Sequence, residues 1–178
     1  MKIRKIDKFI SRLRKYRFPL LILFFMATGS LSILIYAKYL GYFGWNYQTC
    51  VKPKYFYVNR LDKNIPASAF FVFRFKGSGL YPKGSLFVKY MRCVSGETLK
   101  TVLVKNHYRY YCNGKYLGFG RNYSDHGKGF KLPHFIFNGI IPKNRYFAMG
   151  TAWDSYDSRY WGFVREKEII GIAYPLIK

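Results

Sequence analysis

The chain begins with one long apolar run. Residues 18–37 carry no charged side chain. At about 1.5 Å rise per residue, a helix of this length spans about 30 Å, the thickness of a membrane's hydrocarbon core. The pattern predicts a transmembrane helix over 18–37, with Pro19 in its first turn, where a missing N–H has little effect. The alternative, a buried core helix, fits the length and the flank less well.

The segment before this run, residues 1–17, is strongly basic. Its basic residues are Lys2, Arg4, Lys5, Lys8, Arg12, Arg14, Lys15 and Arg17, against the single acid Asp7. Such a flank stays in the cytoplasm, which places residues 38–178 outside. A cleaved signal peptide is the alternative, but its apolar region is shorter, and residues 37–40 are a poor match to its small-residue cleavage site. The pattern therefore favours an uncleaved anchor.

After residue 38 the apolar positions come in short runs rich in Tyr, Phe, Val and Ile. These runs are 55–58, 69–75, 85–89, 99–104, 108–112, 135–137, 146–149 and 169–174. Such side chains suit the pleated, half-buried surface of a sheet, and the Gly, Pro, Asn and Asp between them form turns. Asn113-Gly114 predicts a tight hairpin with a primed turn. The fold class is therefore mostly β, in one exported domain over 38–178.

The net charge of the chain is +23, from 31 basic and 8 acidic residues. Basic residues interleaved with aromatic ones can bind nucleic acid. Here, however, they are spread over the basic tail and the exported part alike, and neither a zinc-ligand spacing nor an RNA-binding signature is present. An anionic membrane surface explains the charge more simply. We therefore expect membrane lipid, and not nucleic acid, as a partner.

All three cysteines, Cys50, Cys93 and Cys112, follow the apolar run. In an oxidising compartment two of them can form a disulfide and one remains. Cys93 and Cys112 fall in or beside predicted strands, which favours a bridge between neighbouring strands and leaves Cys50 over. The alternative is three buried apolar thiols.

Two places in the chain carry candidate chemistry. The rare carboxylates Asp154 and Asp157 lie among Ser155, Ser158 and Arg159. This composition predicts a buried polar network in which the arginine neutralises a carboxylate, with a simple polar turn as an equally weighted alternative.

The second place is Lys89, which ends the apolar run 84–89 between aromatic residues. Burial would lower its pKa and make a neutral amine available as a base. The alternative is a lysine at a strand end that extends its amine to solvent.

Both places resemble motifs of the signal peptidase I family. Residues 89–97 (KYMRCVSGE) resemble the family's box of Lys, Arg, two apolar residues, Gly, apolar, Pro, Gly and Asp, with Cys93 and Ser95 departing from it. Residues 155–162 match the late box Ser-x-Asp-Ser-Arg-x-Trp-Gly at every fixed position. The resemblance implies that Lys89 is the general base, that Ser155 orients it, and that Asp157 and Arg159 brace the site.

Residues 111–118, 139–142 and 146–150 resemble the conjugative-transfer subgroup, which matures pilin-type precursors. This resemblance implies coiled, mostly antiparallel β-sheets and a pilin-like precursor protein as partner, with small residues before the scissile bond. It also implies an inner-membrane location with the C-terminal domain in the periplasm or outside, and no cofactor or metal. Phe70, Phe71 and Tyr90 are candidates for lining the substrate groove.

The expected nucleophile departs from the family pattern. The family's serine lies three residues before a proline, and here that position, before Pro53, holds Cys50. The resemblance thus implies a dyad of Cys50 and Lys89, with the Cys50 backbone N–H as one oxyanion donor and Gln48, two positions upstream where relatives carry a second donor, as the other. The alternatives are a catalytically inactive component of the transfer machine that binds pilin or DNA, and a transpeptidase that cyclises pilin.

Overall fold

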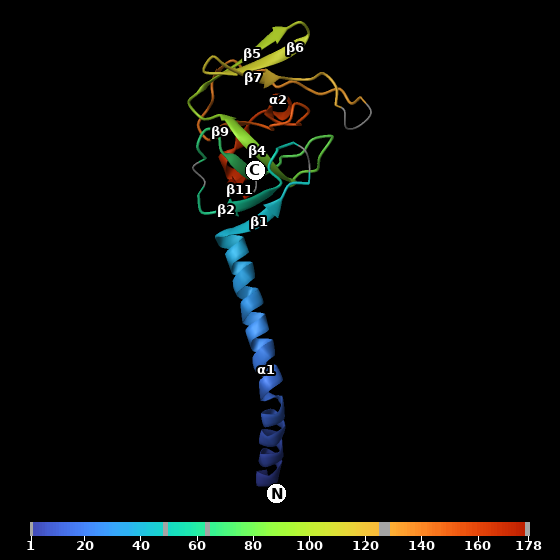
Figure 1. Ribbon diagram of the computed structural model, residues 1–178, viewed down its shortest axis with the longest axis vertical. Coiled ribbons are helices and arrows are strands. Elements are labelled where there is room, and N and C mark those ends of the chain that lie inside the picture. The colour runs from blue at the N-terminus through green and yellow to red at the C-terminus, as the bar shows by residue number, and fades with distance from the viewer. Residues whose placement is uncertain (1, 48–49, 63–64, 125–128, 177–178) are drawn as a thin grey trace. The chain divides into compact units, whose positions relative to one another are not determined.

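The computed structural model of the chain describes residues 2–47, 50–62, 65–124 and 129–176, with side chains from residue 16 onward. The chain forms two compact units, Met1–Leu40 and Gly41–Lys178 (Figure 1). The first unit is a helix and the second is a β-domain, and each is described by itself below.

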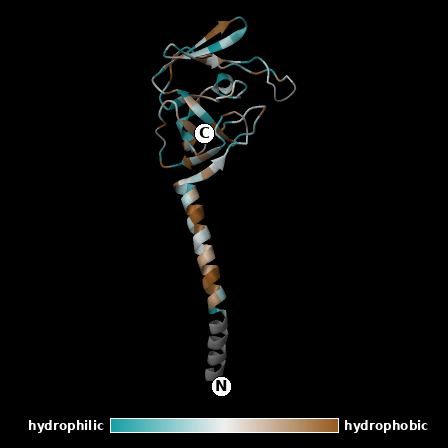
Figure 2. Cartoon of the chain, viewed as in Figure 1, coloured by the Kyte–Doolittle hydropathy of each residue, from teal (hydrophilic) through white to brown (hydrophobic). Residues whose placement is uncertain are grey.

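The first unit is the single helix α1 (Lys2–Tyr39). Its stretch Tyr16–Tyr39 is 24 residues long, has a mean hydropathy of 2.2 and is nowhere buried by protein. Figure 2 shows apolar residues along much of this stretch. The helix fits a single-pass membrane anchor, as the charge-free run predicted. The expectation for Pro19 was wrong: the helix continues back through the basic segment, so Pro19 lies in its interior.

The threonine and serine hydroxyl groups within the apolar stretch bond to carbonyls of the helix itself. Thr28 Oγ1 donates to the carbonyl of Phe24 at 2.9 Å, and Ser30 Oγ donates to that of Met26 at 2.8 Å. A polar group in hydrocarbon needs an internal partner, because lipid supplies none. These residues are therefore compatible with a membrane-spanning helix.

The second unit contains two antiparallel sheets, which confirms the mostly β fold class (Figure 1). The seven-stranded sheet has the order β1 (Gly41–Trp45), β2 (Tyr55–Asn59), β11 (Ile169–Pro175), β3 (Phe70–Arg74), β4 (Leu86–Cys93), β9 (Arg145–Met149) and β10 (Val164–Arg165). The four-stranded sheet has the order β7 (Lys115–Phe119), β6 (His107–Cys112), β5 (Thr98–Val104) and β8 (Gly139–Ile140). The short helices are α2 (Ser158–Trp161) and the 3-10 turn η1 (Glu166–Glu168).

The predicted hairpin joins β6 to β7. Asn113 and Gly114 have φ values of +47° and +79°, and two positive values at the central residues define the primed turn expected there. All the predicted strand runs except 135–137 overlap strands, and the runs 69–75 and 85–89 extend one residue beyond theirs at three ends.

The segment 135–137 is not a strand, because its backbone and rings bond elsewhere. The Phe135 N–H donates to the Arg159 carbonyl at 2.9 Å, and the Phe137 carbonyl accepts from Thr101 Oγ1 at 3.1 Å. Both phenylalanine rings pack edge-on against Phe163. The aromatic run thus fills a cluster beside the four-stranded sheet instead of pairing with a strand.

A disulfide joins Cys93 to Cys112, with a Cα–Cα distance of 5.8 Å. Cys93 ends β4 in the seven-stranded sheet, and Cys112 ends β6 in the four-stranded sheet. The bridge therefore links the two sheets, and the expectation that it joins neighbouring strands was wrong. Leu99 and Tyr110 pack beside it in a fully buried cluster. Cys50 lies outside this disulfide.

Candidate active site

Lys89 lies on the core-facing side of β4. Side chains alternate between the two faces of a strand, and on β4 the buried positions include Phe87, Lys89 and Met91. Only 3% of the lysine's surface is exposed. Its Nζ donates to Ser155 Oγ at 2.8 Å. Burial lowers the pKa of Lys89 below its ordinary value, because the ammonium loses its hydration.

Cys50 interacts with the same amine. Its electrostatic interaction and hydrogen bond with Lys89 both partly oppose the fall in the lysine pKa. The Cys50 carbonyl accepts from the N–H groups of Thr151 and Ala152, at 2.9 and 3.2 Å. The loop that follows β9 therefore holds the backbone of Cys50 in place. The structure thus brings Cys50, Lys89 and Ser155 together around one buried amine.

The carboxylate of Asp157 is the centre of the loop's hydrogen bonding. It binds the Arg159 guanidinium in a bidentate pair, with Nε–Oδ1 at 2.8 Å and Nη2–Oδ2 at 2.7 Å. It also accepts from the N–H of Gly150 at 2.9 Å and caps the N-terminus of α2. Both side chains are buried. This is the buried, arginine-neutralised network that the composition predicted.

Arg159 extends this network to Ser155 and to the other sheet. Its Nη2 donates to the Ser155 carbonyl at 3.1 Å, and its Nη1 donates to the Phe119 carbonyl at 2.7 Å. Burial would lower the pKa of Arg159, but the charge and hydrogen bonds of Asp157 raise it above its ordinary value. The guanidinium therefore stays charged and fixes the backbone of Ser155.

Two further residues support the site, one expected and one not. Ser158, expected in the buried polar network, accepts at its Oγ from the N–H of Ala148 at 2.9 Å, which ties α2 to β9. The Tyr110 hydroxyl donates to the Arg159 carbonyl at 2.7 Å from β6. Burial raises the pKa of Tyr110, so its hydroxyl remains a donor. Tyr110 was not predicted, because nothing in the sequence marks it.

Gly96 and Glu97, at the end of the first motif, form a turn after β4. Within the described residues, their hydrogen bonds do not involve Cys50, Lys89 or Ser155. Gly96 has a φ of +86°, which favours glycine there. The Glu97 carboxylate accepts from the N–H of Val94 at 2.7 Å and from Asn113 Nδ2 at 3.1 Å. Glu97 also lies near the sulfurs of the disulfide, but sulfurs bonded to each other offer no thiolate to a metal.

Other expected positions lie outside the cluster. Gln48, the expected second oxyanion donor, lies outside the described residues. Phe71 is fully buried in the core opposite Lys89. Phe70 and Tyr90 line a different cavity, together with residues of β11. None of these three aromatics is among the residues that line the cavities at Cys50, and their contact with substrate stays a prediction.

Gly150 lies in close contact with both Ser155 and the backbone of Cys50. A Cβ atom at this position would collide with the Ser155 side chain and with the carbonyl oxygen of Cys50. The absence of a side chain lets the loop after β9 pass between them. This contact gives a physical reason for a glycine at the start of the loop.

Gly150→Ala is therefore expected to lower the free energy of unfolding by about 1–3 kcal/mol and to displace Ser155 from Lys89. Thermal unfolding measures the loss of stability, and a structure of the variant shows whether Ser155 has moved. Gly79→Ala is the matched control, because a Cβ there meets only a ring atom of Phe130 at 3.8 Å. Equal stability of the two variants would contradict the close packing described here.

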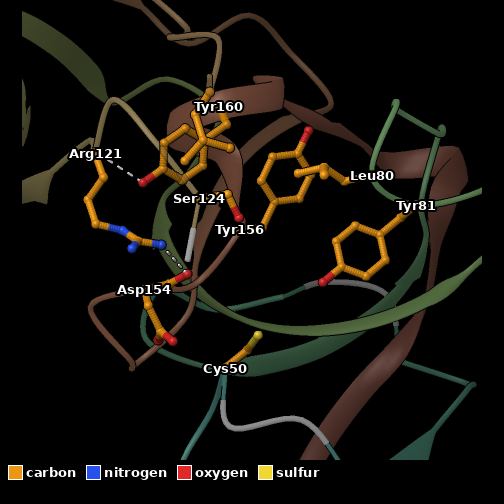
Figure 3. Close-up of a pocket in the computed structure, with 9 residues that line it drawn as sticks. Cys50, Leu80, Tyr81, Arg121, Ser124, Asp154, Tyr156 and Tyr160 are labelled. Atoms are coloured by element: carbon orange, nitrogen blue, oxygen red, sulfur yellow. Dashed lines mark hydrogen bonds between the residues drawn. The ribbon is translucent and has the colours of Figure 1, made fainter. Parts of the chain in front are cut away.

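Two cavities meet at Cys50. The larger, of about 520 Å³, is a groove lined by residues of β1–β4, among them Phe56, Val72 and Lys89. The smaller, of about 270 Å³, is lined by Leu80, Tyr81, Arg121, Ser124, Leu132, Asp154, Tyr156 and Tyr160 besides Cys50. Figure 3 shows the Cys50 sulfur directed toward the smaller cavity. Cys50 thus lines both spaces and Lys89 lines the larger one, whereas Ser155 contacts the Lys89 amine from within the protein.

Comparison with known proteins gives a family match over most of the chain. The model of the family described as signal peptidase, peptidase S26, matches residues 17–177. This range includes the apolar stretch of α1 from Arg17 onward and the β-domain almost to its end.

Three curated relatives, each named Signal peptidase I, are similar to shorter parts of the chain. The protein of Buchnera aphidicola subsp. Schizaphis graminum is 44% identical over 57 residues, 32% of this chain and 18% of the relative. That of Buchnera aphidicola subsp. Acyrthosiphon pisum is 60% identical over 38 residues, 21% of this chain and 12% of the relative. That of Haemophilus influenzae is 54% identical over 35 residues, 19% of this chain and 10% of the relative. The chain therefore matches less than a fifth of the length of each of these relatives.

Proposed function

The chain belongs to the signal peptidase family, peptidase S26, and on this premise we propose that it is a membrane-anchored peptidase that matures exported precursors with a dyad of Cys50 and Lys89. The observation that carries the proposal is the buried Lys89 amine, which interacts with both Cys50 and Ser155. A lysine with a lowered pKa can be neutral and act as a base.

The reaction would proceed in two halves. Neutral Lys89 takes the proton of the Cys50 thiol, and the sulfur attacks the scissile carbonyl carbon. The tetrahedral intermediate collapses, the C–N bond breaks, and the leaving amine takes the proton from the Lys89 ammonium. Lys89 then takes a proton from water, the hydroxide attacks the thioester, and Cys50 leaves as a thiolate that is protonated again by Lys89. We assign the oxyanion donors to the Cys50 N–H and to Gln48.

Ser155, Asp157 and Arg159 are positioning residues in this proposal. Ser155 accepts a hydrogen bond from the Lys89 amine, which directs the amine's lone pair or proton toward Cys50. Arg159 holds the Ser155 carbonyl, and Asp157 holds Arg159. No step of the proposed mechanism requires a metal or cofactor.

The proposed substrate is a pilin-type precursor of a conjugative, type IV secretion system. The resemblance of residues 111–118, 139–142 and 146–150 to that subgroup supports it. The test is mass spectrometry of a co-expressed pilin precursor with and without this chain. Loss of the leader only when the chain is present is the expected result. An unchanged precursor together with salt-sensitive DNA binding would instead favour a non-catalytic component of the machine.

We further expect the N-terminus in the cytoplasm and the β-domain beyond the inner membrane, because basic residues precede the apolar stretch. A periplasmic reporter fused after Lys178 should then be active, and a reporter that works only in the cytoplasm should be silent. Replacing the basic residues of 1–17 with glutamine is expected to weaken this orientation. A cytoplasmic C-terminus in the unaltered chain would overturn both the topology and the proposed substrate class.

A further inference from the structure

The smaller cavity beside Cys50 has one wall of stacked tyrosines. Tyr156 stacks with Tyr81 at a ring-centroid distance of 5.7 Å and with Tyr160 at 5.6 Å. Leu80 and Leu132 complete the apolar lining. Figure 3 shows Tyr156, Tyr81 and Leu80 around the space above the Cys50 sulfur. Because Tyr156 already stacks on both neighbours, this wall offers ring edges and apolar side chains, against which another aromatic ring can pack edge to face.

The polar side of the cavity carries one cation and one anion. Arg121 Nη2 donates to the Asp154 carbonyl at 3.0 Å, and the guanidinium lies over the Trp153 ring at 4.7 Å. The Arg121 N–H donates to the Tyr160 hydroxyl at 3.0 Å. Asp154 lines the same space, so its negative charge lies near the positive charge of Arg121. Because the two charges offset each other, neither a basic nor an acidic side chain gains a strong electrostatic advantage here.

The size of the cavity limits its occupant. A volume of about 270 Å³ lies below the roughly 300–1,000 Å³ of pockets that enclose a whole small ligand. It therefore suits one large side chain. The groove of about 520 Å³, which Cys50 also lines, includes Lys89 and residues of several strands, which suits an extended segment.

We infer that the smaller cavity is a specificity pocket for one aromatic side chain of the segment released by cleavage, at the first or second position after the scissile bond. This inference rests on the proposed function. The extended groove then holds the segment before the bond, where small residues are expected. A peptide that crosses Cys50 must enter both cavities, so the tyrosine-lined one is left for the released side.

Synthetic peptides based on a cleaved precursor test the preference on purified full-length protein. One series places Phe, Ala, Lys or Glu at each of the first two positions after the bond, and a second series makes the same changes at the two positions before it. We expect Phe after the bond to raise kcat/KM about 10-fold or more over Ala, Lys and Glu. A preference for Lys or Glu, equal rates, or a gain from Phe before the bond would each overturn the inference.

Variants of the chain test whether the preference for an aromatic side chain arises in the smaller cavity. Leu80→Trp fills the cavity and is expected to reduce the Phe/Ala ratio of kcat/KM to about 1, and Tyr156→Leu to reduce it several-fold. Tyr116→Ala, at an exposed position on β7, is the matched control and should keep the ratio. An unchanged ratio in Leu80→Trp, with normal unfolding, would place the preference elsewhere.

Failure of the proposed function gives a different result. If no peptide is cleaved, fluorescence-anisotropy binding of labelled peptides that begin with Phe or Ala still reports on the pocket. Tighter binding of the Phe peptide that is lost in Leu80→Trp would support the pocket without catalysis. Equal binding of both peptides would reject the pocket as well.

Discussion

Replacing Lys89 with methionine is expected to abolish precursor processing while the protein stays folded. Methionine has a similar length and no charge, so it fits a site that is 3% exposed. The variant loses the only described amine that interacts with both Cys50 and Ser155. Removal of a general base lowers rates by about 10²–10⁴-fold. Precursor cleavage followed by mass spectrometry measures the loss.

The pH dependence separates a catalytic from a structural role of this lysine. Burial lowers the pKa of Lys89, so the neutral, active amine becomes populated below the ordinary lysine value of about 10.4. The rate should therefore rise with pH and reach a plateau before exposed lysines titrate. Lys100→Met, an exposed position on β5, should leave this profile unchanged. Normal processing by Lys89→Met would show that another group serves as the base.

The same shift makes a prediction for stability. Between the lowered pKa of Lys89 and its unfolded value of about 10.4, the unfolded chain binds one proton more than the folded one. The free energy of unfolding should therefore rise with pH in this window, by up to about 1.4 kcal/mol per pH unit. Lys89→Met should remove this slope and raise stability below the window. Denaturant unfolding at several pH values shows the difference.

The parts of the fold that the sequence predicted are those with local signals. The charge-free run marks α1, and Asn113-Gly114 marks the hairpin between β6 and β7 by its turn preference alone. Runs of aromatic and β-branched residues mark the long strands, because such side chains suit a pleated surface whatever their partner.

The strand β1 could not be predicted in this way. It contains Gly41 and Gly44, which disfavour a strand by themselves. A Cβ on Gly41 would collide with the Val58 carbonyl and the Tyr57 ring, so this glycine is set by the close approach of β2. Such a requirement belongs to the paired strands and leaves no trace in the local pattern.

In the candidate site, too, the residues with local sequence signals were predicted, and those supplied by distant elements were not. Lys89, Ser155, Asp157 and Arg159 stand in two motifs whose residue types and spacing carry their chemistry. Their supports come from distant elements: Tyr110 from β6 and the Phe119 carbonyl from β7. The tyrosine-lined cavity is also assembled from separate segments, and a chain that is 21% aromatic gives no local means of selecting its members.

Cys50→Ala is expected to stop processing, with a loss of about 10⁴-fold or more, because no acyl intermediate can form without the sulfur. The backbone around Cys50 should remain in place, since the Cys50 carbonyl bonds to Thr151 and Ala152 do not involve the side chain. Full activity in this variant would show that the nucleophile lies elsewhere. Thr49, which lies outside the described residues, has the nearest hydroxyl along the sequence.

The processing rate of Cys50→Ser should lie between that of the natural chain and that of Cys50→Ala. It restores the hydroxyl that the family uses, and the Lys89 amine remains beside it, but a hydroxyl gives up its proton less readily than a thiol does. A thiol-alkylating reagent distinguishes the natural chain from Cys50→Ser. It should stop processing by the natural chain and leave processing by Cys50→Ser unaffected. The disulfide withdraws Cys93 and Cys112 from this reagent, so peptide mapping should find the label on Cys50. Alkylation of Cys50 with no loss of processing would remove the thiol from the mechanism, even if Lys89 proved essential.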